Sequence, residues 1–229
     1  METCQHEVVN PNQGLLSFLY VHNEQSPAYI EPHWHRAVEL SYTSKGSIDH
    51  FYIAGENFQT QSGQILVVNT QDIHSIRVLN YKEEPELALT ITYPYPFLVG
   101  QYEDISHCQF DINHPETFST QQKQAYNHLQ DILEMIIRDF QADSPQKNLK
   151  LNLGILQVLD ILVTSFLVDT VADVHKDNRL QIAERIKETF YIKSQEKILN
   201  NKKHPHCDKL ECKLLNRLEN ALVILLFFV

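Results

Sequence analysis

Short apolar segments separated by turn residues dominate the first part of the chain. The segments are rich in Val, Ile, Leu, Tyr and Thr, and clusters such as Lys45-Gly46-Ser47 and Gln61-Ser62-Gly63 lie between them. Short strands at a spacing of roughly ten residues are typical of an antiparallel sandwich or barrel. The predicted strands are Leu15–Val21, Val38–Ser44, Ile48–Ile53, Gln64–Asn69, Ser75–Leu79 and Glu86–Tyr93.

The period of the apolar residues then changes to that of helices. Ser119 or Thr120 can cap a helix that runs to about Ala142, where Ser144-Pro145 ends it. A second helix is predicted over Lys147–Val171, and it must be buried because it is apolar around much of its circumference. The two helices can form an antiparallel pair with a dimer face, or they can simply pack on the sheet. We expect a mainly β protein with added helices.

The end of the chain has a different character. Residues 173–180 are polar and predict a linker, and beyond them only Gln181–Phe190 has weak helical periodicity. The longest apolar run, Ala221–Val229, has nine residues, whereas a membrane span needs roughly 20. We therefore expect no membrane contact. The predicted division is a barrel with an N-terminal arm at 1–110, a helical element at 111–172, a linker at 173–180 and a short tail at 181–229.

Charge and composition narrow the classes of function. Residues 1–179 hold 10 Lys and Arg against 23 Asp and Glu, a net charge of −13, whereas residues 180–229 hold 9 against 6, a net charge of +3. An acidic body of this kind repels DNA. The chain has only 6 Gly and no glycine-rich phosphate loop. Its 4 Cys are too few for a disulfide framework, and the first ten residues resemble no signal peptide, so we expect a reduced, cytoplasmic protein.

Candidate chemistry is concentrated in one short segment. If the segment is a single strand, His33, His35 and Glu39 line the same face, because side chains alternate with a period of two. His74, in a neighbouring strand, is a fourth candidate. Three imidazoles and a carboxylate suit Zn, Fe, Ni or Mn. We nevertheless expect no bound cofactor and expect the four residues to bind a small ligand by hydrogen bonds; a divalent ion in the mouth of the barrel is the alternative.

Three further residues are candidates for contacting a ligand beside this cluster. Tyr42 and Phe51 offer aromatic faces that can cover the CH surface of a sugar, and Arg77 is expected to reach the mouth of the barrel. For both aromatic residues, packing in the core is the competing interpretation.

The spacing of these residues resembles the motifs of a known family. The pattern H-x-H-x3-E-x6-G resembles the first cupin motif, and Gly63 to His74 resembles the second, with Asn69 and Gln71 in place of its usual Pro and Gly. More closely, PHWHRAVELSYTSKGSID and SGQILVVNTQDIHSI resemble the sugar-sensing cupin of AraC/XylS-type transcription regulators. The resemblance covers roughly residues 10–175, because the two helices match as well.

The resemblance implies a jelly-roll effector domain and a regulator that dimerises through helices near 119–171. It implies a small-molecule effector, with carbohydrates as the first candidates, and an N-terminal arm, Glu2–Gly14, that folds over this effector. It also implies a helix-turn-helix DNA-binding domain, which residues 181–229 do not resemble. We therefore expect a degenerate remnant there, with DNA bound weakly or through an intact partner. The alternative function is a metal-dependent cupin enzyme, an isomerase or a dioxygenase.

Overall fold

The computed structural model describes residues 5–24, 26–79, 86–102, 105 and 108–169, within a compact unit that spans residues 1–170. The expectations for 173–180 and 181–229 lie outside the described residues. Within the described part, no helix has both the length and the apolar character needed to cross a membrane.

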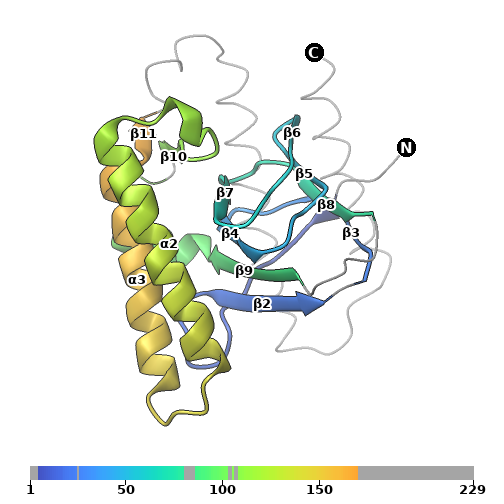
Figure 1. Ribbon diagram of the computed structural model, residues 1–229. Helices are drawn as coiled ribbons and strands as arrows, with labels where there is room; N and C mark the ends of the chain where they lie inside the picture. Colours follow the sequence, from blue (N-terminus) through green and yellow to red (C-terminus); the bar gives the residue numbers. More distant parts are fainter. Residues whose placement is uncertain (1–4, 25, 80–85, 103–104, 106–107, 170–229) are drawn as a thin grey trace, which may run out of the picture. The chain divides into compact units, whose positions relative to one another are not determined.

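Two antiparallel sheets face each other in the first part of the chain (Figure 1). The five-stranded sheet, in spatial order, consists of β1 (Gln5–His6), β3 (Ala28–Trp34), β8 (His74–Val78), β5 (His50–Ile53) and β6 (Glu56–Phe58). The four-stranded sheet consists of β2 (Phe18–Glu24), β9 (Glu86–Tyr93), β4 (Val38–Lys45) and β7 (Gln64–Val68). All their pairings are antiparallel except that of β1 with β3. The predicted jelly-roll arrangement, mainly β with added helices, is confirmed.

All six predicted strands are present, and β9 has the predicted bounds. Four elements were not predicted as strands because they are short or lack an apolar run: β1, β6, β10 (Cys108–Phe110) and β11 (Leu167–Asp169). β3 was not predicted as a strand either, because its apolar and polar residues do not alternate clearly. Helix α1 (Tyr95–Gln101) is a single short element that begins between two prolines, and its seven residues are too few to show a helical period.

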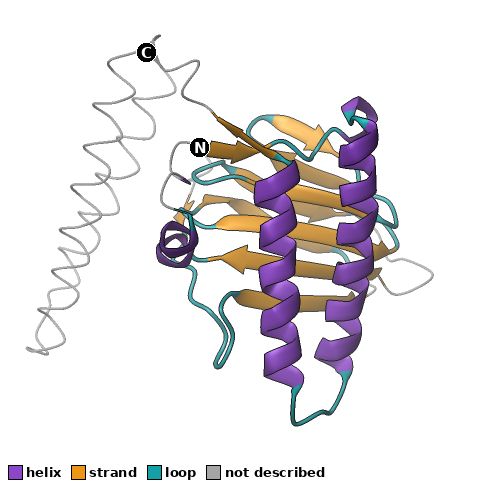
Figure 2. Ribbon diagram, turned by 90° about the vertical axis from the view of Figure 1, so that its left-hand side faces the viewer, coloured by secondary structure: helices purple, strands orange, loops and turns teal. Residues whose placement is uncertain are grey.

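Two long helices cover one face of the four-stranded sheet (Figure 2). α2 (Thr120–Gln141) begins at Ser119, whose side chain forms the predicted cap as a capping box with Gln122. α3 (Lys147–Ser165) ends six residues before the predicted Val171. The prediction of a longer helix is wrong, because the apolar residues after Ser165 pair as β11 with β10. The two helices come close at Gly154, where a Cβ atom would lie 2.6 Å from Ile136 Cγ1.

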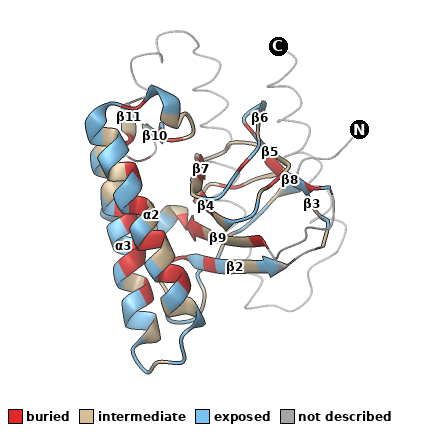
Figure 3. Ribbon diagram, in the orientation of Figure 1, coloured by how far each residue is buried: buried red, intermediate tan, exposed pale blue. Residues whose placement is uncertain are grey.

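The described residues form three layers with two apolar clusters between them. The larger cluster lies between the helices and the four-stranded sheet, and the smaller one lies between the two sheets around Phe51. In Figure 3 the buried residues accordingly follow the helix faces that look toward the sheet. Three leucines of α3 point away from this core and remain exposed: Leu149, Leu153 and Leu156.

β7 lies at an edge of the four-stranded sheet, yet side chains satisfy its outer backbone groups. Asn113 accepts from the N–H of Val67 and donates to its carbonyl oxygen, at 2.7 and 2.9 Å. The Tyr126 hydroxyl, on α2, accepts from the N–H of Ile65 at 2.7 Å. Unpaired edge groups would otherwise be open to another strand. The segment that follows the barrel therefore completes its edge.

Candidate functional site

Three histidines and Glu39 converge at one end of the barrel, from a bend and three strands. β3 ends one residue before His35 and β4 begins one residue before Glu39, so the chain bends between these two residues. His33 lies near the end of β3 and pairs with His74, the first residue of β8. The prediction that one strand aligns the motif is therefore wrong. The side chains nevertheless meet, because the bend carries the chain from one sheet to the other.

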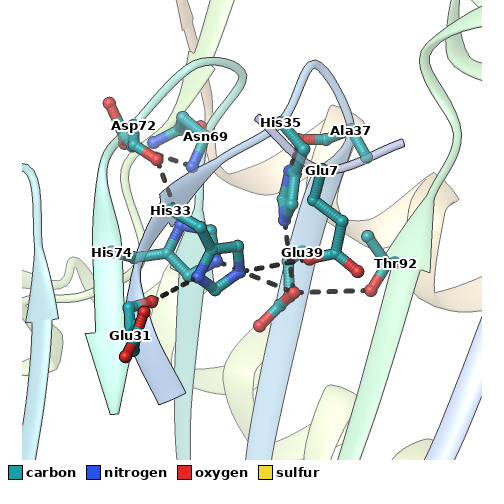
Figure 4. Close-up of polar contacts among 10 residues, drawn as sticks. All are labelled: Glu7, Glu31, His33, His35, Ala37, Glu39, Asn69, Asp72, His74 and Thr92. Carbon is teal, nitrogen blue, oxygen red and sulfur yellow. Dashed lines mark hydrogen bonds and ion pairs between the residues drawn. The ribbon is translucent and has the colours of Figure 1, made fainter. Parts of the chain in front are cut away.

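Each imidazole is held through its Nδ1 atom by a backbone carbonyl two residues away. The acceptors are the carbonyl oxygens of Glu31 for His33 (2.9 Å), Ala37 for His35 (3.0 Å) and Asp72 for His74 (3.1 Å). A carbonyl can only accept, so each Nδ1 carries the proton and each neutral ring keeps a lone pair on Nε2. One ring nitrogen from each histidine lies within 4.8 Å of the other two (Figure 4).

Glu39 brings a carboxylate to the three rings. Its Oε2 lies 3.4 Å from His35 Nε2 and 4.0 Å from His74 Nε2, and it accepts from the Thr92 hydroxyl at 3.5 Å. Burial alone would raise the pKa of Glu39, but the hydrogen bond from His35 and the imidazole charges outweigh it and lower the pKa. The carboxylate is therefore ionised at neutral pH.

The pKa values of the two buried histidines move in opposite directions. Burial acts to lower the pKa of His35, but the hydrogen bond and the charge of Glu39 outweigh it and raise the pKa. Burial lowers the pKa of His74 to about 4, since Glu39 is farther from this ring. His74 is thus a neutral ring at neutral pH, which is the form that binds metals.

The Nε2 atom of His74 is buried and has no hydrogen-bond partner among the described residues. The residue is 1% exposed, and 4.0 Å is too long for a hydrogen bond to Glu39. A buried polar atom without a partner destabilises the fold, so its presence points to a missing binding partner. Histidines that bind metals commonly donate their other N–H to a carbonyl, as all three do here. The donor set of three imidazoles and a carboxylate therefore fits a divalent ion such as Zn, Fe, Mn or Ni.

A second carboxylate reaches the cluster from the N-terminal segment. Glu7 Oε2 lies 3.3 Å from His33 Nε2, and the Glu7 side chain is about half exposed. The β1 strand just before it pairs with the end of β3. Glu7 lies within the arm that the family resemblance implies at Glu2–Gly14, but nothing in the sequence distinguishes it from the other residues of that arm.

The turn before His74 carries backbone strain. Gln71, which stands where the cupin motif usually has Gly, has a φ of 71°, in the left-handed region that favours glycine. Its N–H donates to the carbonyl oxygen of His35 at 2.9 Å. The strained residue thus ties the turn before β8 to the bend that holds His35.

The other predicted ligand contacts are not brought to the cluster. Tyr42 faces the helices and donates to Glu134 on α2 at 2.8 Å, because it lies an odd number of residues from Glu39 on the same strand. Phe51 is fully buried in the smaller apolar cluster. Arg77 faces outward, with its guanidinium 5.0 Å from the centre of the Tyr29 ring. Neither Tyr42 nor Arg77 is therefore placed where it was expected.

The inner face of the four-stranded sheet adds residues that the sequence analysis missed. Residues that are directly paired across strands lie on the same face of a sheet. Glu39 is in one such row across β2, β9 and β4, which consists of Phe18, Thr92 and Glu39. The next row on the same face consists of Tyr20, Thr90 and Ser41. The two aromatic residues, from β2, are 37% and 48% exposed. Alternation along β2 could not reveal them, because Leu19 between them and Val21 after them are also apolar.

Several solved structures match part of the chain. A predicted oxalate decarboxylase from Thermotoga maritima is 16% identical over 34% of this chain and 68% of its own, with a TM-score of 0.30. An RmlC-like cupin from Shewanella frigidimarina is 16% identical over 38% and 83%, with a TM-score of 0.29. A DMSP lyase from Ruegeria pomeroyi is 21% identical over 33% and 36%, also with a TM-score of 0.29.

No curated protein matches the sequence. The sequence model of the AraC-like ligand binding domain, in contrast, matches residues 16–159. This match spans every strand of both sheets except β1, and most of the two long helices, including all four residues of the histidine and Glu39 cluster. The chain therefore belongs to the family of AraC-like ligand-binding domains.

Proposed function

We propose that this chain is the effector-sensing part of an AraC-type transcription regulator. Its effector would be a small polyhydroxylated molecule, with sugars as the first candidates. It would bind on the inner face of the four-stranded sheet, beside the three imidazoles. The observation that carries the proposal is the convergence of His33, His35 and His74 with Glu39, on a sheet face that also carries exposed aromatic side chains and hydroxyl groups. The family match supports sensing over catalysis, because it extends from the barrel into the helices.

The chemistry of the inner face suits a sugar. Phe18 and Tyr20 offer exposed ring faces for CH groups, and the hydroxyls of Thr90, Thr92 and Ser41 lie on the same face. The space between the sheets farther along is filled by the apolar cluster around Phe51. We therefore place the effector over β2, β9 and β4, next to Glu39.

A divalent ion would be held by His33, His35, His74 and Glu39. When bound, it would supply positive charge and open coordination positions for an oxygen of the effector. The chain's own residues would orient the effector. Glu39 would accept from a hydroxyl group, and the aromatic rings would exclude water from one side of it.

Signal transfer would use dimers formed through α3. Leu149, Leu153 and Leu156 are exposed at spacings of four and three residues, as in a coiled-coil seam. An apolar stripe of this kind is self-complementary, so we propose a second copy of this chain as its occupant. Effector binding would then act by favouring one arrangement of the dimer over another.

A thermal-shift screen of the full chain tests the effector proposal. The panel contains aldopentoses, aldohexoses and uronic acids, each with and without Zn²⁺, Mn²⁺, Ni²⁺ or Fe²⁺. We expect a saturable rise in Tm with one class of sugar. Tyr20→Ala should remove this rise, whereas Tyr52→Ala should keep it, because Tyr52 is similarly exposed but lies on the outer face of the other sheet. An equal loss in both variants, or no sugar response, would contradict the proposal.

A second candidate function is a metal-dependent isomerase or dioxygenase, favoured by the donor set of three imidazoles and Glu39. The metal-loaded protein would be incubated with each sugar that stabilises it, in air, and the mixture analysed by NMR. The sensing proposal expects the sugar to be recovered unchanged. A new product that His74→Ala no longer forms would establish the enzyme instead.

A further inference from the structure

We propose that Glu7 is a further ligand of the divalent ion at the histidine cluster, supplied by the N-terminal segment. The inference rests on the proposed function, because it requires a metal ion held by His33, His35, His74 and Glu39. It adds a residue from outside the two cupin motifs and joins β1 to the site.

The backbone places Glu7 at the rim of the site. β1 pairs in parallel with β3, with Gln5 opposite His33, and the N–H of Glu7 donates to the carbonyl oxygen of Trp34 at 3.0 Å. The ring of His6 packs on that of Trp34, with their centres 4.4 Å apart. These contacts hold the Cα of Glu7 near the end of β3, and its carboxylate turns toward the imidazoles (Figure 4).

The distances match those between two ligands of one ion. Neighbouring ligand atoms that lie about 2.0–2.1 Å from a five-coordinate ion subtend angles of about 90–120°, which places them about 2.9–3.6 Å from each other. Glu7 Oε2 lies 3.3 Å from His33 Nε2, and Glu39 Oε2 lies 3.4 Å from His35 Nε2. Each carboxylate thus stands beside a different imidazole at the spacing that a shared ion requires. The exposed Glu7 side chain is free to adjust.

The charges favour the same arrangement. With Nδ1 of each ring donating to a carbonyl, each imidazole directs Nε2 toward the space between the rings, and His35 offers a lone pair there once an ion replaces the proton that it shares with Glu39. Glu7 and Glu39 add two negative charges beside these nitrogen atoms. Like partial charges repel, and one divalent cation would balance both carboxylates and accept all three lone pairs.

The consequence is that the ion should fasten the N-terminal segment to the barrel. β1 has only two residues, so its pairing is weak by itself. A bond from Glu7 to the ion would add a strong contact directly after it. Zinc should therefore slow hydrogen exchange in residues 5–7, and this effect should depend on the Glu7 carboxylate.

The experiment compares the full-length wild type with Glu7→Gln and Glu31→Gln. Glu31 is the matched control, since it is an exposed carboxylate two residues from His33 on the same strand. Zinc affinity is measured by competition with a chromogenic chelator, and hydrogen exchange of residues 1–14 is followed by mass spectrometry with and without Zn²⁺. We expect Glu7→Gln to bind zinc at least about tenfold more weakly and to lose the zinc-dependent protection. Glu31→Gln should keep wild-type affinity and protection.

Two results would overturn the assignment while leaving the metal site intact. One is a wild type that binds zinc together with a Glu7→Gln variant of equal affinity and protection. The other is an equal loss of affinity in Glu7→Gln and Glu31→Gln, which would reveal a general effect of charge. A wild type that binds none of Zn²⁺, Mn²⁺, Ni²⁺ and Fe²⁺ would instead refute the metal site of the proposed function, and the role of Glu7 with it.

Discussion

The close approach of α2 and α3 at Gly154 makes Gly154→Ala a direct test of the packing. The new Cβ would lie 2.6 Å from Cγ1 and 3.0 Å from Cδ1 of Ile136, whereas carbon atoms pack best at about 3.5–4.0 Å. Ile136 is buried and cannot swing into solvent. Overpacking of this kind costs about 1–3 kcal/mol, and the better helix propensity of Ala returns about 1 kcal/mol.

Gly100→Ala is the matched control, because Gly100 also lies in a helix and a Cβ there would meet no atom of the described residues within 4 Å. The control should gain only the helix propensity of Ala and be stabilised by about 1 kcal/mol. The free energy of unfolding, from urea titrations of the full chain, should therefore be about 1–3 kcal/mol lower in Gly154→Ala than in Gly100→Ala. For a chain of this size the difference corresponds to roughly 2–4 °C in Tm per kcal/mol.

A double-mutant cycle identifies the clash as the cause. In an Ile136→Ala background the two clashing atoms are absent, so adding Gly154→Ala should no longer destabilise the protein. If Gly154→Ala is as stable as Gly100→Ala, or if the cycle shows no coupling, the helices are not as close as described.

Four further predictions concern the site and the surfaces around it. At a free zinc concentration of 100 times Kd, zinc should raise the free energy of unfolding by about 2.7 kcal/mol; His74→Ala should abolish the rise, and a rise that persists would contradict the ligand assignment. Tyr42→Phe loses the hydrogen bond to Glu134 and should cost about 0.5–1.5 kcal/mol, with zinc affinity unchanged because Tyr42 faces the helices; a weaker affinity would refute this orientation. Leu153→Glu should give monomers in light scattering while Asn127→Glu, at an exposed position of α2, does not; a dimer in both variants would exclude the α3 stripe. Gln71→Val should destabilise the fold in a urea titration by more than about 1 kcal/mol, whereas Gln71→Gly should not, because a β-branched residue tolerates a φ of 71° poorly.

The fold could be predicted from the sequence because its signals are local. Apolar segments of five to eight residues between turns define the strands, and the Ser119 cap with its following stripe defines α2. The end of α3 could not be predicted, because Leu167 and Val168 continue the apolar pattern whether they form a helix or pair with β10. Helical periodicity says nothing about such a competing partner.

The site could be predicted only in part, for a related reason. His33, His35, Glu39 and His74 were identified by motif spacing, although the assumed single strand is in fact a bend between two sheets. Glu7, Phe18 and Tyr20 reach the same region through pairing with distant strands, which leaves no mark on their own segments. The prediction for Tyr42 was wrong because it overlooked the alternation along its strand. Glu39 lies on the side of β4 that carries polar or small residues, whereas Tyr42 lies on the apolar side and faces the helices.

The hydrogen bonds that Asn113 and Tyr126 make to β7 imply that the barrel should not tolerate a truncation that removes these two residues. A fragment that stopped at residue 110 would keep every strand of the two sheets and lose the side chains that shield this border. Its bare amide and carbonyl groups would then recruit β7 of another molecule, so we expect such fragments to form filaments or insoluble particles. The segment from Asn113 to Tyr126 would thus protect the barrel edge from association with another molecule.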